Sequence, residues 1–309
     1  MVDDLLSTLK VLEDVTVESS LEPLPFVEPV MLIIGYGELG VNVVRILNDS
    51  DSYNFRLYLI KAFFFEDFIR ILKTSSLSAK LSFLIFRLDS LNLLSDAEKI
   101  VKYLSDISEN VAVIISIPLK ITNKVDIGEI IKMLERIRAY SSVFLLEETA
   151  IDNDYCCFDP RYAVEDRIAE CLDSLVHSTA IVPSSSYFYT LKKFFSRKRI
   201  GSLNYFTVDI RWELDEESVF KKFMRIPLRN IRLYDIEEAL FLISLCSDQI
   251  SSETFFDALL ITRKILDKIS LTSSYLGDLS NKNMGDSMGV AYFILLKNES
   301  NFSEKIREC

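Results

Sequence analysis

Three of the eight glycines in this 309-residue chain fall within six positions, at Gly35, Gly37 and Gly40. They form a GxGxxG pattern between an apolar run at 30–34 and a helical pattern that begins near 41. Glycine adopts positive φ and lets two backbone segments approach closely. Between a strand and a helix, the pattern is typical of a turn whose first helical amides bind a phosphate group. The sequence therefore predicts a phosphate-binding turn with the following candidate residues: Gly35, Tyr36, Gly37, Glu38, Leu39 and Gly40.

Composition and charge exclude several classes of protein. Apolar residues make up 49% and charged residues 26% of the chain, which is typical of a globular protein, and the length predicts two domains. The net charge of -11 argues against nucleic acid as a partner, because a phosphate backbone requires a basic surface. One basic stretch, which we interpret as a solvated helix end, contains Lys192, Lys193, Arg197, Lys198 and Arg199, interleaved with Phe194 and Phe195.

Cysteine usage and hydropathy indicate a cellular compartment. The five cysteines form no CxxC pair and no signal peptide precedes them, so we expect a reduced, cytoplasmic protein. No apolar run approaches the roughly 18 residues that a membrane span requires. The single histidine, His177, is expected to be structural. We predict no metal site. The acidic pair Glu147 and Glu148 could hold a metal or repel a phosphate, but we favour a solvated sheet edge.

The first part of the chain alternates between apolar strands and amphipathic helices. Strands are expected at 30–34, 55–60, 82–87, 111–115, 142–146 and 178–182, and helices at 40–48, 65–73, 95–108, 127–139 and 160–175. This alternation predicts a Rossmann-like, mostly parallel sheet with helices on both faces. Ligands of such sheets bind at the carboxyl ends of the strands, where the glycine turn lies.

The order of elements changes after about residue 186. We expect helices at 187–198, 216–225 and 251–268, strands at 202–212 and 239–246, and a strand pair at 273–277 and 289–297. These elements predict a smaller α/β C-terminal domain with a mixed sheet. The expected organisation is an acidic N-terminal extension or partner-binding arm at 1–29, a nucleotide-binding domain at 30–186, a shortened connecting helix at 187–201, and the C-terminal domain at 202–309.

The glycine turn alone is compatible with more than one ligand. A dehydrogenase that binds NAD carries an acidic residue at the end of its second strand, but Lys61 and Ala62 stand there in this chain. A lysine suits the 2′-phosphate of NADP, so an NAD(P)-dependent oxidoreductase remains an alternative. A further alternative is a non-enzymatic interaction module without nucleotide, in which the glycines only let the strand and helix pack closely.

Several segments, in the same order along the chain, resemble the FtsZ/tubulin superfamily. The segment IIGYGELGVNVVRIL resembles the first nucleotide loop of FtsZ, including an asparagine at Asn42, and FDPRYAVEDRIAECLDSLVHSTAIVPSSSYF resembles the sixth helix and the strand after it. The segment MRIPLRNIRLYDIEEALFLISLCSDQISSETFFDALLITRKIL is similar to the helix, break, strand and long helix of the C-terminal half. The segment YLGDLSNKNMGDSMGVAYFILL is similar to the last two strands and the acidic box between them.

The resemblance implies a guanine nucleotide, GTP or GDP, and a set of binding residues. Beyond the turn, these are Asn42, then Ser116, Lys120 and Thr122 in the second loop, Asp159 and Arg161 near the ribose, and Ser184 near the base. The second loop departs from the family, because SIPLKITNKVDIGE stands where the family has GGGTGTG. Only glycines let several backbone amides converge on phosphates.

A second departure concerns catalysis. The family has a long central helix and an acidic catalytic loop before the second domain, but only about 20 residues separate Val182 from the strand at 202, so both are expected to be lost. The segment GSLNYFTVDIR can be aligned with the catalytic loop, which makes Asp209 a weak catalytic candidate. We favour its alignment with the first strand of the C-terminal domain.

The resemblance therefore implies a divergent FtsZ/tubulin-like cytoskeletal or cell-division-related protein. The expected GTPase activity is weak or absent, as in a pseudoenzyme. Such a protein would act by self-association or by modulating an active homologue.

Overall fold

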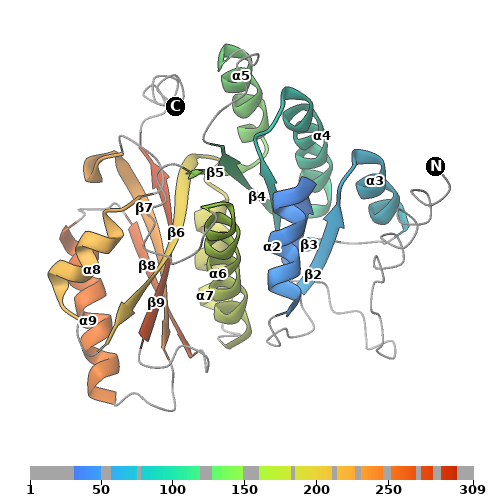
Figure 1. Ribbon diagram of the computed structural model, residues 1–309. Helices are drawn as coiled ribbons and strands as arrows, with labels where there is room; N and C mark the ends of the chain where they lie inside the picture. Colours follow the sequence, from blue (N-terminus) through green and yellow to red (C-terminus); the bar gives the residue numbers. More distant parts are fainter. Residues whose placement is uncertain are drawn as a thin grey trace, which may run out of the picture.

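The computed structural model describes most of the chain. The described residues are 31–49, 57–74, 78–118, 127–148, 160–181, 185–210, 214–226, 231–245, 252–268, 273–280 and 287–297. Within them, the strands form one nine-stranded sheet with helices on both faces, which confirms the α/β class (Figure 1).

The first part of the chain supplies five parallel strands and the helices that connect them. The elements are β1 (Met31–Tyr36), α2 (Gly37–Asp49), β2 (Leu57–Ala62), α3 (Phe65–Thr74), β3 (Ala79–Arg87), α4 (Leu91–Ile107), β4 (Ser108–Ile117), α5 (Ile127–Arg138) and β5 (Ser142–Glu147). The central strands are buried along their whole length: β1 and β5 have no exposed residue. This burial explains why their sequences are continuous apolar runs rather than alternating patterns.

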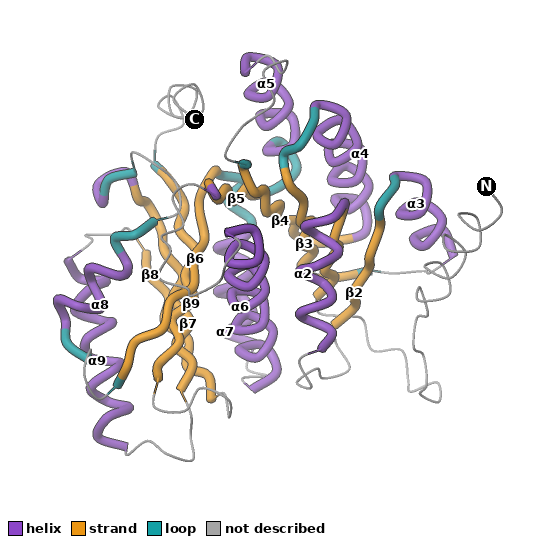
Figure 2. Tube along the Cα trace, viewed as in Figure 1, coloured by secondary structure: helices purple, strands orange, loops and turns teal. Residues whose placement is uncertain are grey.

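The second part extends the same sheet. Its elements are α6 (Pro160–Ile181), α7 (Ser185–Phe195), β6 (Ile200–Asp209), α8 (Glu216–Phe223), the short 3₁₀ helix η2 (Leu233–Asp235), β7 (Ile236–Leu245), α9 (Ser252–Lys268), β8 (Ser273–Ser280) and β9 (Ser287–Leu296). Figure 2 shows the strands as a continuous layer that runs through the molecule.

The strand order is β2-β1-β3-β4-β5-β6-β9-β7-β8. All neighbours pair in parallel except at β9, which is antiparallel to both β6 and β7, so the sheet is mixed in its second half. Only two residue pairs, Val143 with Ile200 and Phe144 with Gly201, join β5 to β6. The pairing of β6 with β9 extends over nine residue pairs.

Two apolar layers cover the sheet. One contains buried side chains of α3, α4, α5, α8 and α9, and the other contains buried side chains of α2, α6 and α7. Figure 1 shows α6 in the middle of the molecule, between α2 and the strands of the second half. This arrangement of helices on alternate faces is that of a doubly wound sheet.

The prediction of a strand at 178–182 is wrong for residues 178–181, because α6 continues to Ile181. Its buried apolar residues follow a helical spacing that includes Ile168, Leu172 and Leu175, and the hydroxyl of Ser178 donates to the carbonyl of Leu175 at 2.7 Å. The resemblance places the family's long central helix between Val182 and the strand at 202, where the described structure has the 11-residue α7.

The other expected elements occur with shifts of a few residues at their ends, but one pairing differs. The expected strand pair at 273–277 and 289–297 is not a pair in the described structure, because β7 lies between β8 and β9. β7 therefore has a neighbouring strand on each side, which satisfies the hydrogen-bonding groups of its backbone, and its apolar residues 239–243 are buried. No helix among the described residues is long and apolar enough to cross a membrane.

Candidate functional site

The glycine turn joins β1 directly to α2 at the carboxyl edge of the sheet. A Cβ atom on Gly35 would lie 2.0 Å from the carbonyl oxygen of Gly40, and one on Gly40 would lie 2.2 Å from the carbonyl oxygen of Ile85 in β3. Real Cβ atoms do not approach backbone atoms so closely. Two of the three glycines therefore let α2 pack against β1 and β3.

Gly37 has a different role. Its φ is +70°, a conformation that glycine adopts readily, and no atom lies within 4 Å of the place where its Cβ would be. It is the first residue of the 13-residue α2, so the amides of the first helical turn lie at this open place. The amides and the dipole of the helix favour an oxyanion such as a phosphate group at this position. Glu38, which is exposed in the same turn, is the nearest carboxylate along the chain.

The strand order determines which loop faces this turn. The chain leaves β1 to form β2 on one side and returns to form β3 on the other, so the order reverses between β1 and β3. Ligands of doubly wound sheets bind in the crevice at such a switch point. The facing loop is therefore 88–90, between β3 and α4, and its Ser90 caps α4 by accepting from the amide of Leu93 at 3.3 Å.

The sequence instead suggests the loop after β4, which begins near Ser116. In the structure Ser116 lies one strand further from the turn and is fully buried. Its hydroxyl donates to Oε1 of Glu148 at 2.9 Å. Sequence reasoning did not single out the residues at the end of β3, where an RLDS segment with three polar residues follows the apolar run.

Arg87 is the main positive charge beside the switch point. Its Nη2 donates to Oε2 of Glu148 at 3.0 Å, its Nε lies 2.9 Å from Oε1 of the same carboxylate, and Nε lies 3.4 Å from Asp89. The Glu148 side chain is 2% exposed and that of Arg87 is 24% exposed. This pair explains the burial of Glu148, which follows β5. Glu147, the last residue of β5, is buried as well, so the solvated edge expected from the sequence is wrong.

Two carboxylates, those of Glu38 and Asp89, interact beside the glycine turn. Burial raises the pKa of the Asp89 carboxyl, the neighbouring Glu38 carboxylate raises it further, and the Arg87 guanidinium opposes the rise. The influence of Glu38 on Asp89 indicates that the turn and the loop after β3 bring acidic groups together. These acidic groups would repel a bare polyphosphate. They would accept a phosphate more easily when a divalent cation neutralises it.

Three further candidate residues are occupied by structural contacts. The buried Tyr36 donates its hydroxyl to Oδ2 of Asp96 in α4 at 3.1 Å, and burial together with Asp96 raises the pKa of this phenol. Asn42 donates to Oε1 of Glu165 at 3.0 Å and so links α2 to α6. Leu39 is buried in the apolar layer beneath α2. These contacts fix α2 relative to its neighbours.

The remaining predicted residues lie elsewhere. Asp209 ends β6 opposite Ser287 of β9, in the strand that the favoured alignment places there. Arg161 lies in the first turn of α6, but its side chain is outside the described part of the structure. Also outside the described residues are Lys120, Thr122, Asp159 and Ser184. Among the described residues, no three His, Cys, Asp or Glu side chains form a group that could hold a metal ion.

The fold and the turn together define a Rossmann-like protein with a phosphate-compatible turn at its switch point and a sheet that continues into a mixed second half. No family model matches the sequence, and no curated protein matches it. Solved structures do match the fold. An empty FtsZ dimer from M. jannaschii is similar at a TM-score of 0.70 and 11% identity, with 96% of this chain and 93% of that chain covered.

Two other groups of structures are similar over nearly the whole chain. CetZ from Methanosaeta thermophila matches at a TM-score of 0.64 and 11% identity, with 91% of this chain and 90% of that one covered. TubZ from Bacillus thuringiensis serovar israelensis, in GDP-form protofilaments, matches at 0.62 and 11% identity, with 91% and 92% covered. The chain therefore has the FtsZ/tubulin fold.

Proposed function

We propose that this chain is a divergent FtsZ/tubulin-like cytoskeletal protein of the cytoplasm. In this proposal it binds a guanine nucleotide at the glycine turn, hydrolyses it slowly or not at all, and acts by assembling with copies of itself or with an active homologue. The observation that carries the proposal is the open, positive-φ Gly37 at the switch point of an FtsZ/tubulin fold.

Weak hydrolysis is expected from the residues of the loop after β3, which faces the turn. The loop after β3 contains no glycine, so it lacks the means to direct several backbone amides at one phosphate. Its charged groups are Arg87 and Asp89, and Arg87 is already paired with the buried Glu148. Electrostatic stabilisation of developing charge is the largest catalytic contribution in many enzymes, and here it would be small.

Assembly is supported by the similar structures. The FtsZ structure from M. jannaschii is a dimer, and the TubZ structures include protofilaments and a four-stranded filament. By analogy, we propose that copies of this chain self-associate. A role in cell division is part of the same proposal, and it rests on the fold-level similarity alone.

Guanine nucleotide is favoured over NADP as the ligand. TubZ is seen in GDP and GTPγS forms, and CetZ1 from Haloferax volcanii is seen bound to GDP. In this chain the register places Lys61 of β2 opposite Gly35 of β1, which keeps a basic residue near the turn. That lysine suits either an NADP phosphate or a nucleotide phosphate, so it does not distinguish the two ligands.

Sedimentation velocity and phosphate release test this proposal together. Purified protein would be studied with Mg²⁺ and either GTP, GDP or no nucleotide. We expect larger species with GTP and a phosphate-release rate near background. Rapid GTP turnover would contradict the proposed loss of activity, and a monomer under every condition would contradict self-association.

A further inference from the structure

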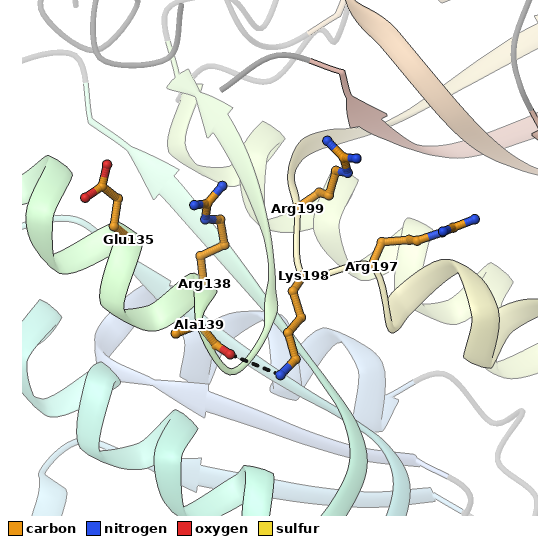
Figure 3. Close-up of a pocket in the computed structure, with 6 residues that line it drawn as sticks. All are labelled: Glu135, Arg138, Ala139, Arg197, Lys198 and Arg199. Atoms are coloured by element: carbon orange, nitrogen blue, oxygen red, sulfur yellow. Dashed lines mark hydrogen bonds between the residues drawn. The ribbon is translucent and has the colours of Figure 1, made fainter. Parts of the chain in front are cut away.

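A basic pocket lies at the amino-terminal edge of the sheet, opposite the glycine turn. It has a volume of about 380 Å³ and is lined by Glu135, Arg138, Ala139, Arg197, Lys198 and Arg199 (Figure 3). The first three residues belong to the end of α5 and the turn before β5. The last three connect α7 to β6. The glycine turn lies at the other ends of these parallel strands, so the pocket is a separate site.

The two helices that form the pocket approach the edge from opposite faces of the sheet. α5 belongs to one apolar layer and α7 to the other, and their carboxyl ends meet here. Nζ of Lys198 donates to the carbonyl oxygen of Ala139 at 3.1 Å, as the dashed line in Figure 3 shows. The amide of Val143 donates to the carbonyl of Arg199 at 2.8 Å and so ties β5 to the start of β6.

The side chains lining the pocket carry an excess of positive charge, with four cations and one carboxylate. Two of the cations are paired behind the pocket: Arg197 lies 2.7 Å from the buried Glu238, and Arg199 lies 3.2 Å from Glu237. Lys198 is exposed and bonds a carbonyl oxygen, so among the described contacts no carboxylate neutralises it. A concentration of cations in a chain of net charge -11 requires an explanation.

Helix capping explains only part of this cluster. Cations are favourable at the carboxyl ends of helices, and α5 and α7 both end here. However, Lys198 has a φ of +49°, and it is the only non-glycine residue with positive φ in the described structure. Glycine is the residue that this conformation favours, and a lysine there costs backbone energy. A lysine is therefore held at the pocket in a conformation that glycine would adopt more easily.

The acidic partner is provided by the same chain. Residues 1–29 contain seven acidic residues and one basic residue, so six of the eleven net negative charges fall in this segment. The chain enters β1 at Met31, at the same edge of the sheet as the pocket, because β1 is parallel to β5 and β6. Three strand spacings separate β1 from β5, or about 14 Å. A 29-residue segment spans up to about 95 Å when extended, so it reaches the pocket easily.

We propose that the acidic segment 1–29 docks in cis on the basic pocket formed by α5, α7 and the start of β6. The proposal is independent of nucleotide binding. The contacts would be ion pairs between carboxylates of the segment and the cations that line the pocket, above all Lys198. Because these side chains are partly exposed, the docking should weaken as salt rises from about 50 mM to about 500 mM.

Zero-length carbodiimide cross-linking of the full chain tests the location. It joins a carboxylate to a lysine amine only when the two are in contact. We expect mass spectrometry to find links from residues 1–29 concentrated on Lys198, at a yield that does not depend on protein concentration. Links spread evenly over surface lysines would overturn the proposal. Links that increase with protein concentration would also overturn it, because the segment would then dock on another copy.

Cleavage by a Glu-specific protease tests which cations of the pocket hold the segment, since the segment contains four glutamates at which the protease can cut. The variants Lys198→Gly and Arg138→Gln should each accelerate cleavage in the segment by about threefold. Lys102→Gln, an exposed lysine of α4, is the matched control and should not change it. Lys198→Gly suits the positive φ, so its melting temperature should not fall below that of the wild type. Unchanged cleavage in this folded variant would overturn the proposal.

Discussion

At the scale of single residues, the three glycines of one motif separate into two roles. Gly35 and Gly40 are required because backbone atoms occupy the places of their Cβ atoms, and Gly37 is required because of its φ. The motif is therefore partly a packing device and partly a candidate binding element. The two roles can be separated by substitution.

Gly40→Ala and Gly37→Ala should behave differently. The added methyl group of Gly40→Ala meets the carbonyl of Ile85, so we expect a loss of about 3 kcal/mol or more in the free energy of unfolding. Gly37→Ala meets no atom and should cost about 1 kcal/mol, from its φ alone. Chemical denaturation measures both. Equal losses for the two variants would contradict this division of roles.

The Arg87–Glu148 pair gives a second prediction at this scale. Glu148→Gln keeps a side-chain oxygen that can accept the hydrogen bond from the Ser116 hydroxyl. It removes the negative charge that pairs with the Arg87 guanidinium. We expect the dissociation constant for GTP to fall about fivefold, because Arg87 becomes available to a phosphate. Isothermal titration measures the change.

The control for this pair is Ser116→Ala, which removes the hydrogen bond and leaves the charges unchanged. It should bind GTP as the wild type does. Weaker binding by Glu148→Gln would show that the carboxylate does not compete with the nucleotide.

At the scale of elements, local sequence patterns predict most helices and strands, since apolar periodicity is a local property. The turn at Gly35–Gly40 is predictable for the same reason. The end of α6 is not, because the segment that reaches Ile181 contains a short apolar run that suits a strand equally well. Only the packing of this segment against the sheet decides between a helix and a strand.

The same limit applies to the loop that faces the glycine turn. Which loop faces the glycine turn depends on strand order, and strand order is set by long-range packing. Arg87 and Glu148 are 61 residues apart, and no local pattern connects them. Their pairing also explains why Glu148, which follows a strand, is buried rather than solvated.

The helix α6 carries a pH-sensitive face. Burial raises the pKa of the Glu170 carboxyl to about 7, and the neighbouring Asp173 and Asp166 add to the rise. The pKa of His177 is raised as well, chiefly by its hydrogen bond to Asp173. Both groups bind a proton more tightly in the folded chain than in the unfolded one. The free energy of unfolding should therefore fall as pH rises, between about 4.5 and 7 for Glu170 and above about 6.5 for His177.

Glu170→Gln removes the carboxylate part of this dependence. Between pH 5 and pH 8, its free energy of unfolding should change by on the order of 2 kcal/mol less than that of the wild type. Urea denaturation at several pH values measures the difference. Glu129→Gln, an exposed glutamate of α5, should keep the wild-type dependence. An unchanged slope in Glu170→Gln would contradict the prediction.

At the scale of the whole molecule, one sheet connects two candidate sites at its opposite edges. The carboxyl edge carries the glycine turn with acidic neighbours, and the amino edge carries the basic pocket. The sequence predicts the FtsZ/tubulin fold from the order of its segments, and the structural similarity confirms that fold. The ligand and the partner depend on surfaces that no sequence segment marks by itself.

The most direct test of the central claim is the melting temperature of the purified protein with GTP, GDP or NADPH in the presence of Mg²⁺. A ligand that binds the folded chain raises this temperature as its concentration rises. We predict a rise with GTP and GDP, none with NADPH, and none in Gly37→Ala. A rise with NADPH alone, or no rise with any guanine nucleotide, would contradict the account.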